Sequence, residues 1–172
     1  RRKRLMSEMA PNSVAIIPAA REVTRSRDTE YPFRQNSDFF YLTGFQEPDG
    51  VLFLLPGRRQ GQVLMFCRDR DPERELWDGY RQGPEGVVKN FGMNDAYPVG
   101  DMDDIVPGLI EGRSTVYYSM GHDDSFDRQV FAWINQIRAK VRTGAKPPGD
   151  ISDLAVLLHE HRLIKSEAEV RI

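Results

Sequence analysis

The sequence predicts an α/β domain built in three layers, with strands that alternate with helices along the chain. Two observations carry this expectation. Short β-branched and aromatic runs such as Thr115–Ser119 are typical of strands. The stretch from Ser125 to about Val141 repeats apolar residues at spacings of three and four, which is the period of a helix. With 172 residues, 40% of them hydrophobic, the chain can form about one domain with a packed core.

The first half of the chain combines a helix, strands and loops. In order, we expect a helix at Arg2–Met9, a buried strand at Ser13–Ala19, a polar loop at Arg21–Ser37, a short helix at Phe39–Thr43, and strands at Val51–Leu55 and Gln62–Cys67. Ser37 or Asp38 can cap the short helix, and Gly44 can end it. The turn residues at positions 56–61 predict a hairpin loop between the last two strands.

The second half alternates element types more regularly. In order, we expect a helix at Gly83–Phe91, a strand at Ala96–Val99, a helix from Asp101 to about Ile110, a strand at Thr115–Ser119, the long helix from Ser125, a loop at Gly144–Asp150, a helix from about Asp153 to Arg162, an extended segment at Leu163–Ser166, and a helix from Glu167. Asp101 and Ser152 are the expected N-caps.

Composition excludes several classes of function. The net charge of -2 argues against broad attraction to nucleic acid or to an anionic membrane, although the chain begins with Arg1–Arg4. No stretch reaches the roughly 20 apolar residues of a membrane span, and no apolar run follows Arg1–Arg4 as in a signal peptide. Cys67 is the single cysteine, which excludes an internal disulfide. We therefore expect a cytoplasmic protein. The missing initiator Met and the helical pattern cut at Ile172 indicate part of a longer protein.

The three histidines do not form a metal-binding pattern. His159 and His161 are two residues apart, which places them about 200° apart around a helix, so one metal cannot take both there. We interpret them as partly exposed helix residues. His122 follows a glycine, and we interpret it as a surface-loop residue.

The acidic clusters have a structural explanation. Asp101, Asp103 and Asp104 open one predicted helix, and a second acidic group at positions 123–127 opens another. Carboxylates at these places offset the helix dipole and cap free N–H groups. The sequence also lacks a phosphate-binding loop, a dinucleotide fingerprint and a nucleophile elbow. It therefore predicts no catalytic constellation, which favours a binding or accessory domain.

Two segments have unusual composition. Six aromatic residues occur between Glu30 and Phe45, and we expect them mainly to fasten a loop to the core. Trp77 lies between charged residues and a glycine, outside any periodic element. Its surroundings leave two alternatives open, a core residue or an exposed anchor for a partner or substrate.

Several blocks closely resemble the N-terminal domain of bacterial-type Xaa-Pro aminopeptidases. The most specific is Tyr-Pro-Phe-Arg-Gln-Asn-Ser-Asp-Phe, which begins at Tyr31. The blocks that carry the resemblance are Glu22–Ser26, Tyr31–Phe45, Glu47–Asp49, Arg68–Asp71, Glu75–Gly79 and His159–Ser166. They occur in order over nearly the whole chain. The resemblance implies a creatinase-type α/β domain, with a mixed sheet flanked by helices, over residues 1–165. Residues 166–172 would begin the connection to a catalytic domain.

The resemblance also implies a function. Family members are two-domain hydrolases whose C-terminal pita-bread domain holds two divalent metals, usually manganese; those ligands would lie beyond Ile172, and this chain would carry no metal ligand or catalytic residue. The N-terminal domain supports dimers or tetramers and helps wall the substrate cleft, partly from a neighbouring subunit. Trp77 matches the tryptophan that such enzymes place at the cleft for the Xaa-Pro peptide. Arg142 falls where related enzymes carry a cleft arginine, although the loop after it, residues 146–149, departs from the family pattern.

An alternative function remains open at this point. Creatinase-type N-terminal domains also occur beside catalytic domains that have lost their metals, where they bind peptides or other proteins. On that reading the chain is a binding module. The sequence beyond Ile172 distinguishes the two, because only the peptidase requires ligands for the two metals there.

Overall fold

A six-stranded mixed sheet forms the centre of the domain. The computed structural model describes residues 1–171, without the side chains of Asp78 and Ala168. The order of strands in the sheet is β6-β5-β4-β1-β7-β8. β4 is antiparallel to the other strands, which are parallel to one another. The strands are β1 (Ser13–Pro18), β4 (Val51–Leu54), β5 (Val63–Cys67), β6 (Asp95–Pro98), β7 (Thr115–Tyr117) and β8 (Asp150–Ser152).

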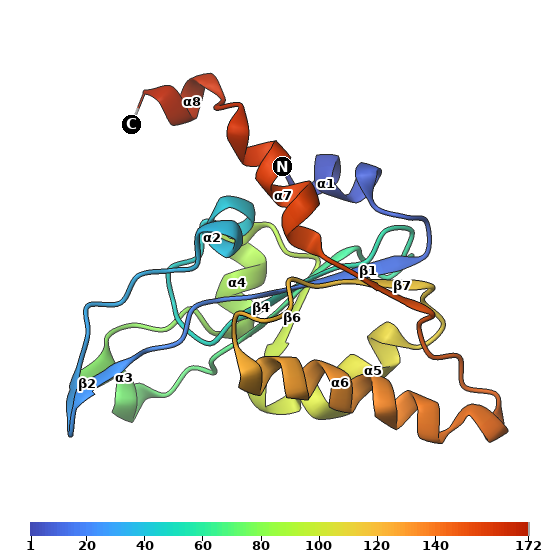
Figure 1. The fold of residues 1–172 in the computed structure, drawn as a ribbon. Coiled ribbons are helices and arrows are strands. Elements are labelled where there is room, and N and C mark those ends of the chain that lie inside the picture. Colours follow the sequence, from blue (N-terminus) through green and yellow to red (C-terminus); the bar gives the residue numbers. More distant parts are fainter. Residues whose placement is uncertain (172) are drawn as a thin grey trace.

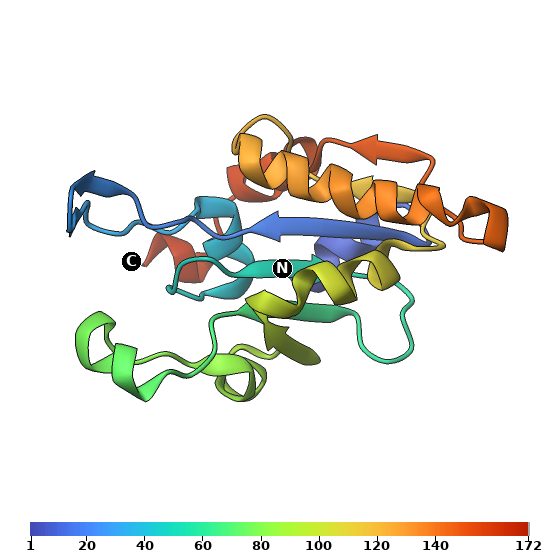
Figure 2. The same ribbon diagram turned by 90° about the horizontal axis from the view of Figure 1, so that it is seen from below.

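Helices cover both faces of the sheet, which confirms the three-layer α/β prediction. The helices α5 (Met102–Ile110) and α6 (Asp124–Ala139) pack below the sheet in Figure 1. The other face is covered by α1 (Arg2–Glu8), α2 (Ser37–Thr43), α4 (Gly83–Phe91) and α7 (Leu154–Leu163). Figure 2 shows the same sheet from below, with α5 and α6 crossing it.

Each face of the sheet has its own apolar core because side chains alternate along a strand. In β1, Val14 and Ile16 face α5 and α6, whereas Ala15 and Ile17 face the other helices. The central strands β1, β4 and β5 are apolar on both faces, which explains their continuous hydrophobic runs. The helix period predicted after Ser125 is confirmed, since α6 buries residues at that spacing: Phe126, Val130, Ile134 and Ile137.

In the first half, three predictions are wrong in detail. The predicted polar loop contains a small antiparallel ribbon, β2 (Thr24–Ser26) and β3 (Thr29–Glu30), whose residues are all exposed. A periodic apolar face is absent there, so no hydrophobic signal marks these strands. The cap of α2 is Asn36, whose side chain accepts hydrogen bonds from the amides of Asp38 and Phe39, whereas Ser37 and Asp38 lie inside the helix. Gly44 ends α2 as predicted, with φ 69°.

The third error concerns Trp77. A short helix, α3 (Pro72–Asp78), occupies the segment that showed no periodicity. The side chain of Asp71 accepts a hydrogen bond from the amide of Arg74, and Pro72 stands in the first turn. These are strong start signals for a helix. Only seven residues follow, which is too short for an apolar repeat to show.

In the second half, the elements are confirmed but their caps differ. Asp101 precedes α5, but its side chain makes no capping hydrogen bond. The helix α7 begins one residue later than predicted, and Asp153 caps it instead of Ser152, which belongs to the unpredicted edge strand β8. The helix α6 ends at Ala139, and Val141–Thr143 form a 3-10 turn before Gly144, whose φ is 98°.

The chain ends on the side of the sheet that α7 covers. Ser166 caps α8 (Glu167–Val170) through a capping box with Glu169, so a helix begins at Glu167 as predicted. Ile172 lies outside the described residues, and the division after residue 165 stays a prediction. None of the helices described for residues 1–171 combines the length and apolar character needed to cross a membrane.

Candidate functional site

The helix α3 presents the largest exposed aromatic side chain described in the domain. Trp77 is 89% exposed, and Leu76 and Tyr80 beside it are 83% and 62% exposed. All the apolar side chains of α3 face solvent. Gly79 ends the helix with φ 85°, and the chain then returns towards α4. Of the two alternatives for Trp77, the structure excludes burial in the core of this domain.

Polar contacts hold this exposed helix to the domain. The guanidinium of Arg70 donates two hydrogen bonds to the carboxylate of Glu75, with N–O distances of 2.5 and 2.9 Å. It also lies 4.6 Å from the centre of the Tyr80 ring. The amide of Gln82 donates to Glu47 Oε1 at 2.7 Å. The Arg70 contacts therefore join the chain after β5 to α3, and the Glu47 contact joins the loop before β4 to the chain that enters α4.

Charge and burial oppose each other at these two glutamates. The hydrogen bond from Arg70 lowers the pKa of Glu75, with smaller contributions from the Arg70 charge and nearby amides. Burial raises the pKa of Glu47, and the hydrogen bond from Gln82 and the charges of Arg68 and Arg81 partly oppose this rise. Glu47 Oε2 is buried and has no hydrogen-bond partner among residues 1–171.

The second predicted site residue, Arg142, lies elsewhere. It belongs to the exposed 3-10 turn Val141–Thr143 that follows α6. In both views α3 projects from one end of the domain, and the chain that follows α6 forms the opposite end (Figures 1 and 2). The structure therefore does not bring Trp77 and Arg142 to a common surface of one chain.

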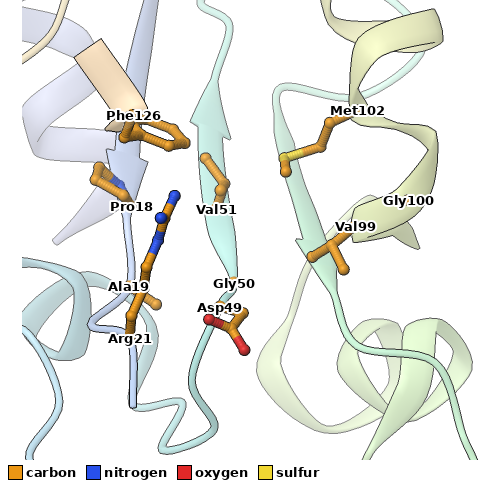
Figure 3. A pocket seen from close by; sticks show the side chains of 10 residues that line it. All are labelled: Pro18, Ala19, Arg21, Asp49, Gly50, Val51, Val99, Gly100, Met102 and Phe126. Atoms are coloured by element: carbon orange, nitrogen blue, oxygen red, sulfur yellow. The ribbon is translucent and has the colours of Figure 1, made fainter. Parts of the chain in front are cut away.

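A small pocket opens at the carboxyl end of β1. It has a volume of about 320 Å³, and its walls include Val51, Met102 and Phe126. Figure 3 shows the side chain of Arg21 extending along this pocket towards Phe126. The charge of Arg21 is already engaged, since its guanidinium contacts Asp123 at 3.4 Å and donates to Ser125 Oγ at 2.8 Å. Neither Trp77 nor Arg142 lines the pocket, and we assign it no chemical role.

The histidines fall into two classes. His122 and His159 are exposed and both line a depression of about 210 Å³ with Asp38 and Asp123. Those two carboxylates are engaged by an ion pair with Arg162 and by the cap of α6, respectively. His161 was predicted to be partly exposed, and this is wrong: it is buried, because α7 turns it towards α1, where Nε2 lies 2.7 Å from Glu8 Oε2.

The acidic clusters have structural roles, but not all are caps. Asp123 caps α6 as predicted, accepting from the amides of Ser125 and Phe126. Asp103 instead accepts a hydrogen bond of 2.7 Å from the indole of Trp133. Asp127 accepts one of 2.6 Å from the hydroxyl of Tyr118; burial raises the pKa of this tyrosine, and the hydrogen bond to Asp127 adds to the rise. Across residues 1–171, no group of three or more His, Cys, Asp or Glu side chains is arranged to hold a metal.

Sequence reasoning missed Glu47, Arg70 and Gln82. Glu47 and Arg70 both stand in blocks that carry the family resemblance, so a signal was present, but the blocks are far apart in sequence. Only the folded chain shows that Arg70 bonds Glu75 of α3 and that Glu47 bonds the amide of Gln82, where the chain enters α4.

The comparisons with known proteins agree with this architecture. Residues 1–117 match the family described as "Aminopeptidase P, N-terminal domain". The Xaa-Pro aminopeptidase of Escherichia coli is 36% identical over 173 residues, which is all of this chain and 39% of that protein. Human Xaa-Pro aminopeptidase 3 is 33% identical, over 84% of this chain and 29% of its own length.

Solved structures confirm the fold. The structure of Pseudomonas aeruginosa aminopeptidase PepP superposes with a TM-score of 0.97 at 56% identity, covering 99% of this chain. Escherichia coli aminopeptidase P in a low-pH form superposes with a TM-score of 0.95 at 36% identity. The chain spans 39% of the length of each of these structures. By its sequence match and its fold, the chain belongs to the aminopeptidase P N-terminal domain family.

Proposed function

We propose that this chain is the non-catalytic part of an Xaa-Pro aminopeptidase, where it helps wall the substrate cleft and supports oligomer formation. The observation that carries the proposal is the agreement of the whole chain with Xaa-Pro aminopeptidases, together with an aromatic helix that covers nothing in its own domain. A large exposed aromatic surface in a monomeric domain marks a contact site.

Trp77 is the proposed contact for the substrate. A proline ring is compact and apolar, and it packs well against the flat face of an indole. Trp77 offers that face at the end of α3, and no described apolar side chain of the helix is buried. We propose that Leu76 and Tyr80 complete the same contact surface.

Arg142 is a second proposed cleft residue, and it lies far from Trp77 in the domain. Because the turn that carries it lies at the opposite end of the domain from α3, the two cannot serve one cleft from a single chain of this domain. In a homo-oligomer, one subunit would supply Trp77 and another would supply Arg142. This arrangement supports the proposed dimer or tetramer.

The remaining partner is the catalytic domain itself. Several apolar residues near the C-terminal end are exposed: Val156, Leu163, Ile164 and Val170. We propose that the catalytic domain covers them. Residues 1–171 do not fit a two-metal site, so we place the two divalent ions, manganese by family analogy, outside them. Such ions supply an activated hydroxide and stabilise developing charge. We also propose a cytoplasmic location.

Hydrolysis by the full-length protein tests the proposal. We expect it to release alanine from Ala-Pro-Ala, to leave Ala-Ala-Ala uncut, to lose activity on removal of divalent metals and to regain it with Mn²⁺. The matched tripeptide controls for general peptidase activity. A folded full-length protein that binds Ala-Pro-Ala without cleaving it would overturn the peptidase proposal and favour the binding module.

A further inference from the structure

The position of α3 depends on polar contacts. Helices in globular proteins are held mainly by packing an apolar face, and an isolated helix of seven residues is unstable in water. In α3 the apolar residues Leu76 and Trp77 point outward, whereas the side chain of Glu75 faces the domain and is only 12% exposed. What fixes this helix is therefore the set of contacts made by Glu75 and by the chain on either side of the helix.

The first contact centre is Arg70. Its guanidinium bonds both oxygens of Glu75 and lies over the ring of Tyr80, so it links the residues before, within and after α3. A bidentate arrangement of this kind fixes orientation as well as distance. Gly83 packs against the same side chain. A Cβ at Gly83 would lie 2.8 Å from Arg70 Cγ, and the φ of Gly83 is 63°.

The second contact centre is Glu47. It accepts the hydrogen bond from the Gln82 amide where the chain leaves the α3 segment and enters α4. The charges of Arg68 and Arg81 favour its ionised form despite burial. Glu47 thus fixes the chain that follows α3, and Arg70 fixes the chain that precedes it.

We propose that Arg70 and Glu47 are positioning residues that hold α3, and with it Trp77, in place for the substrate. The proposal rests on the proposed function, in which Trp77 contacts the peptide. Arg70 is half exposed, and ion pairs of that kind contribute little to global stability. Loss of Arg70 therefore releases α3 while the sheet and both cores stay folded, and loss of the Glu47 charge loosens the chain where it leaves the α3 segment.

The test uses 5-fluorotryptophan in the full-length protein, with the signals of Trp77 and Trp133 assigned by Trp77→Phe and Trp133→Phe. We expect Arg70→Gln to narrow the ¹⁹F signal of Trp77, because a released α3 moves faster than the domain. The signal of the buried Trp133 should stay in place, and the melting temperature within about 3 °C. Arg74→Gln is the matched control, because Arg74 lies on the same helix with its side chain 72% exposed. Glu47→Gln keeps an acceptor for the Gln82 amide but loses the charge, and we expect it to narrow the Trp77 signal less.

Kinetics give the second readout. We expect Arg70→Gln to raise KM for Ala-Pro-Ala about tenfold with kcat little changed, as for a misplaced binding group. In a Trp77→Ala background the same substitution should add nothing, because it acts through Trp77. An unchanged width of the Trp77 signal in both Arg70→Gln and Glu47→Gln would overturn the positioning role, and so would an equal narrowing of the Trp133 signal. An unchanged KM in Trp77→Ala would overturn the proposed function instead, and the fluorine signals would still decide the positioning role.

Discussion

The imidazole of His161 lies 2.7 Å from the carboxylate of Glu8, and this contact joins the last long helix to the first. The histidine side chain is 1% exposed, whereas the side chain of Glu8 is 40% exposed. With Glu8 ionised, Nε2 carries the proton and donates it to the hydrogen bond. The bond with His161 is the largest cause that lowers the pKa of Glu8.

This pair predicts a pH-dependent contribution to stability. Because folding lowers the pKa of Glu8, its contribution is present above the unfolded value near 4.5 and is lost as the pH falls through the folded value. We expect Glu8→Gln to lower the urea midpoint at pH 7 and to lower it less at pH 3.5, where part of the contribution has been lost. Glu160→Gln, an exposed glutamate on α7, is the control. A Glu8→Gln effect of equal size at both pH values would contradict the account.

The single thiol is predicted to be unreactive in the folded protein. Cys67 is fully buried at the end of β5, and burial raises its pKa to about 12. The thiolate is the reactive form, and at pH 8 about one thiol in ten thousand would be ionised. We expect an aromatic disulfide reagent to label Cys67 only at the rate of unfolding, and at once in guanidinium chloride. Immediate labelling of the native protein would show that the β5 end is open.

Trp133 is predicted to be a structural tryptophan. It is fully buried between α5 and α6 and donates a hydrogen bond to Asp103. We expect Trp133→Ala to cost about 3–5 kcal/mol of stability in urea unfolding, as large buried aromatics do. Trp133→Phe should cost less, since it keeps most of the packing. A loss below about 1 kcal/mol for Trp133→Ala would mean that this face of the sheet repacks.

Residues 1–172 alone are predicted to be inactive. The described residues contain no group of side chains that could hold a catalytic metal. We expect no release of alanine from Ala-Pro-Ala when Mn²⁺ is added, and no stoichiometric micromolar Mn²⁺ site by calorimetry. Turnover that a chelator abolishes would show that the chain itself carries a metal site.

The sheet and the long helices could be predicted because their signals are local and repeated. The strands β1, β4 and β5 are buried on both faces and α6 is buried on one. The order of apolar residues in the sequence reflects this burial directly. The caps were harder: Asn36 and Asp153 each lie one residue before the first helical residue, next to other residues able to cap. Choosing among neighbouring capping residues depends on backbone angles that the sequence does not display.

The missed features have a common physical reason. The burial of His161 depends on the approach of Glu8, more than 150 residues away, and the contact where the chain enters α4 joins Glu47 to Gln82. Such contacts between distant segments leave no period in the sequence. Trp77 was singled out because its neighbours are charged, and that same feature left its helix unrecognised.

The most direct test of the account is Trp77→Ala, measured in stability and in catalysis on the full-length protein. Since Trp77 is 89% exposed, we expect the free energy of unfolding to change by less than about 0.5 kcal/mol. Losing a contact of about 1–3 kcal/mol would raise KM for Ala-Pro-Ala about 5- to 150-fold, with kcat little changed. Stability and KM that both match the wild type would contradict the claim that α3 presents Trp77 to the substrate.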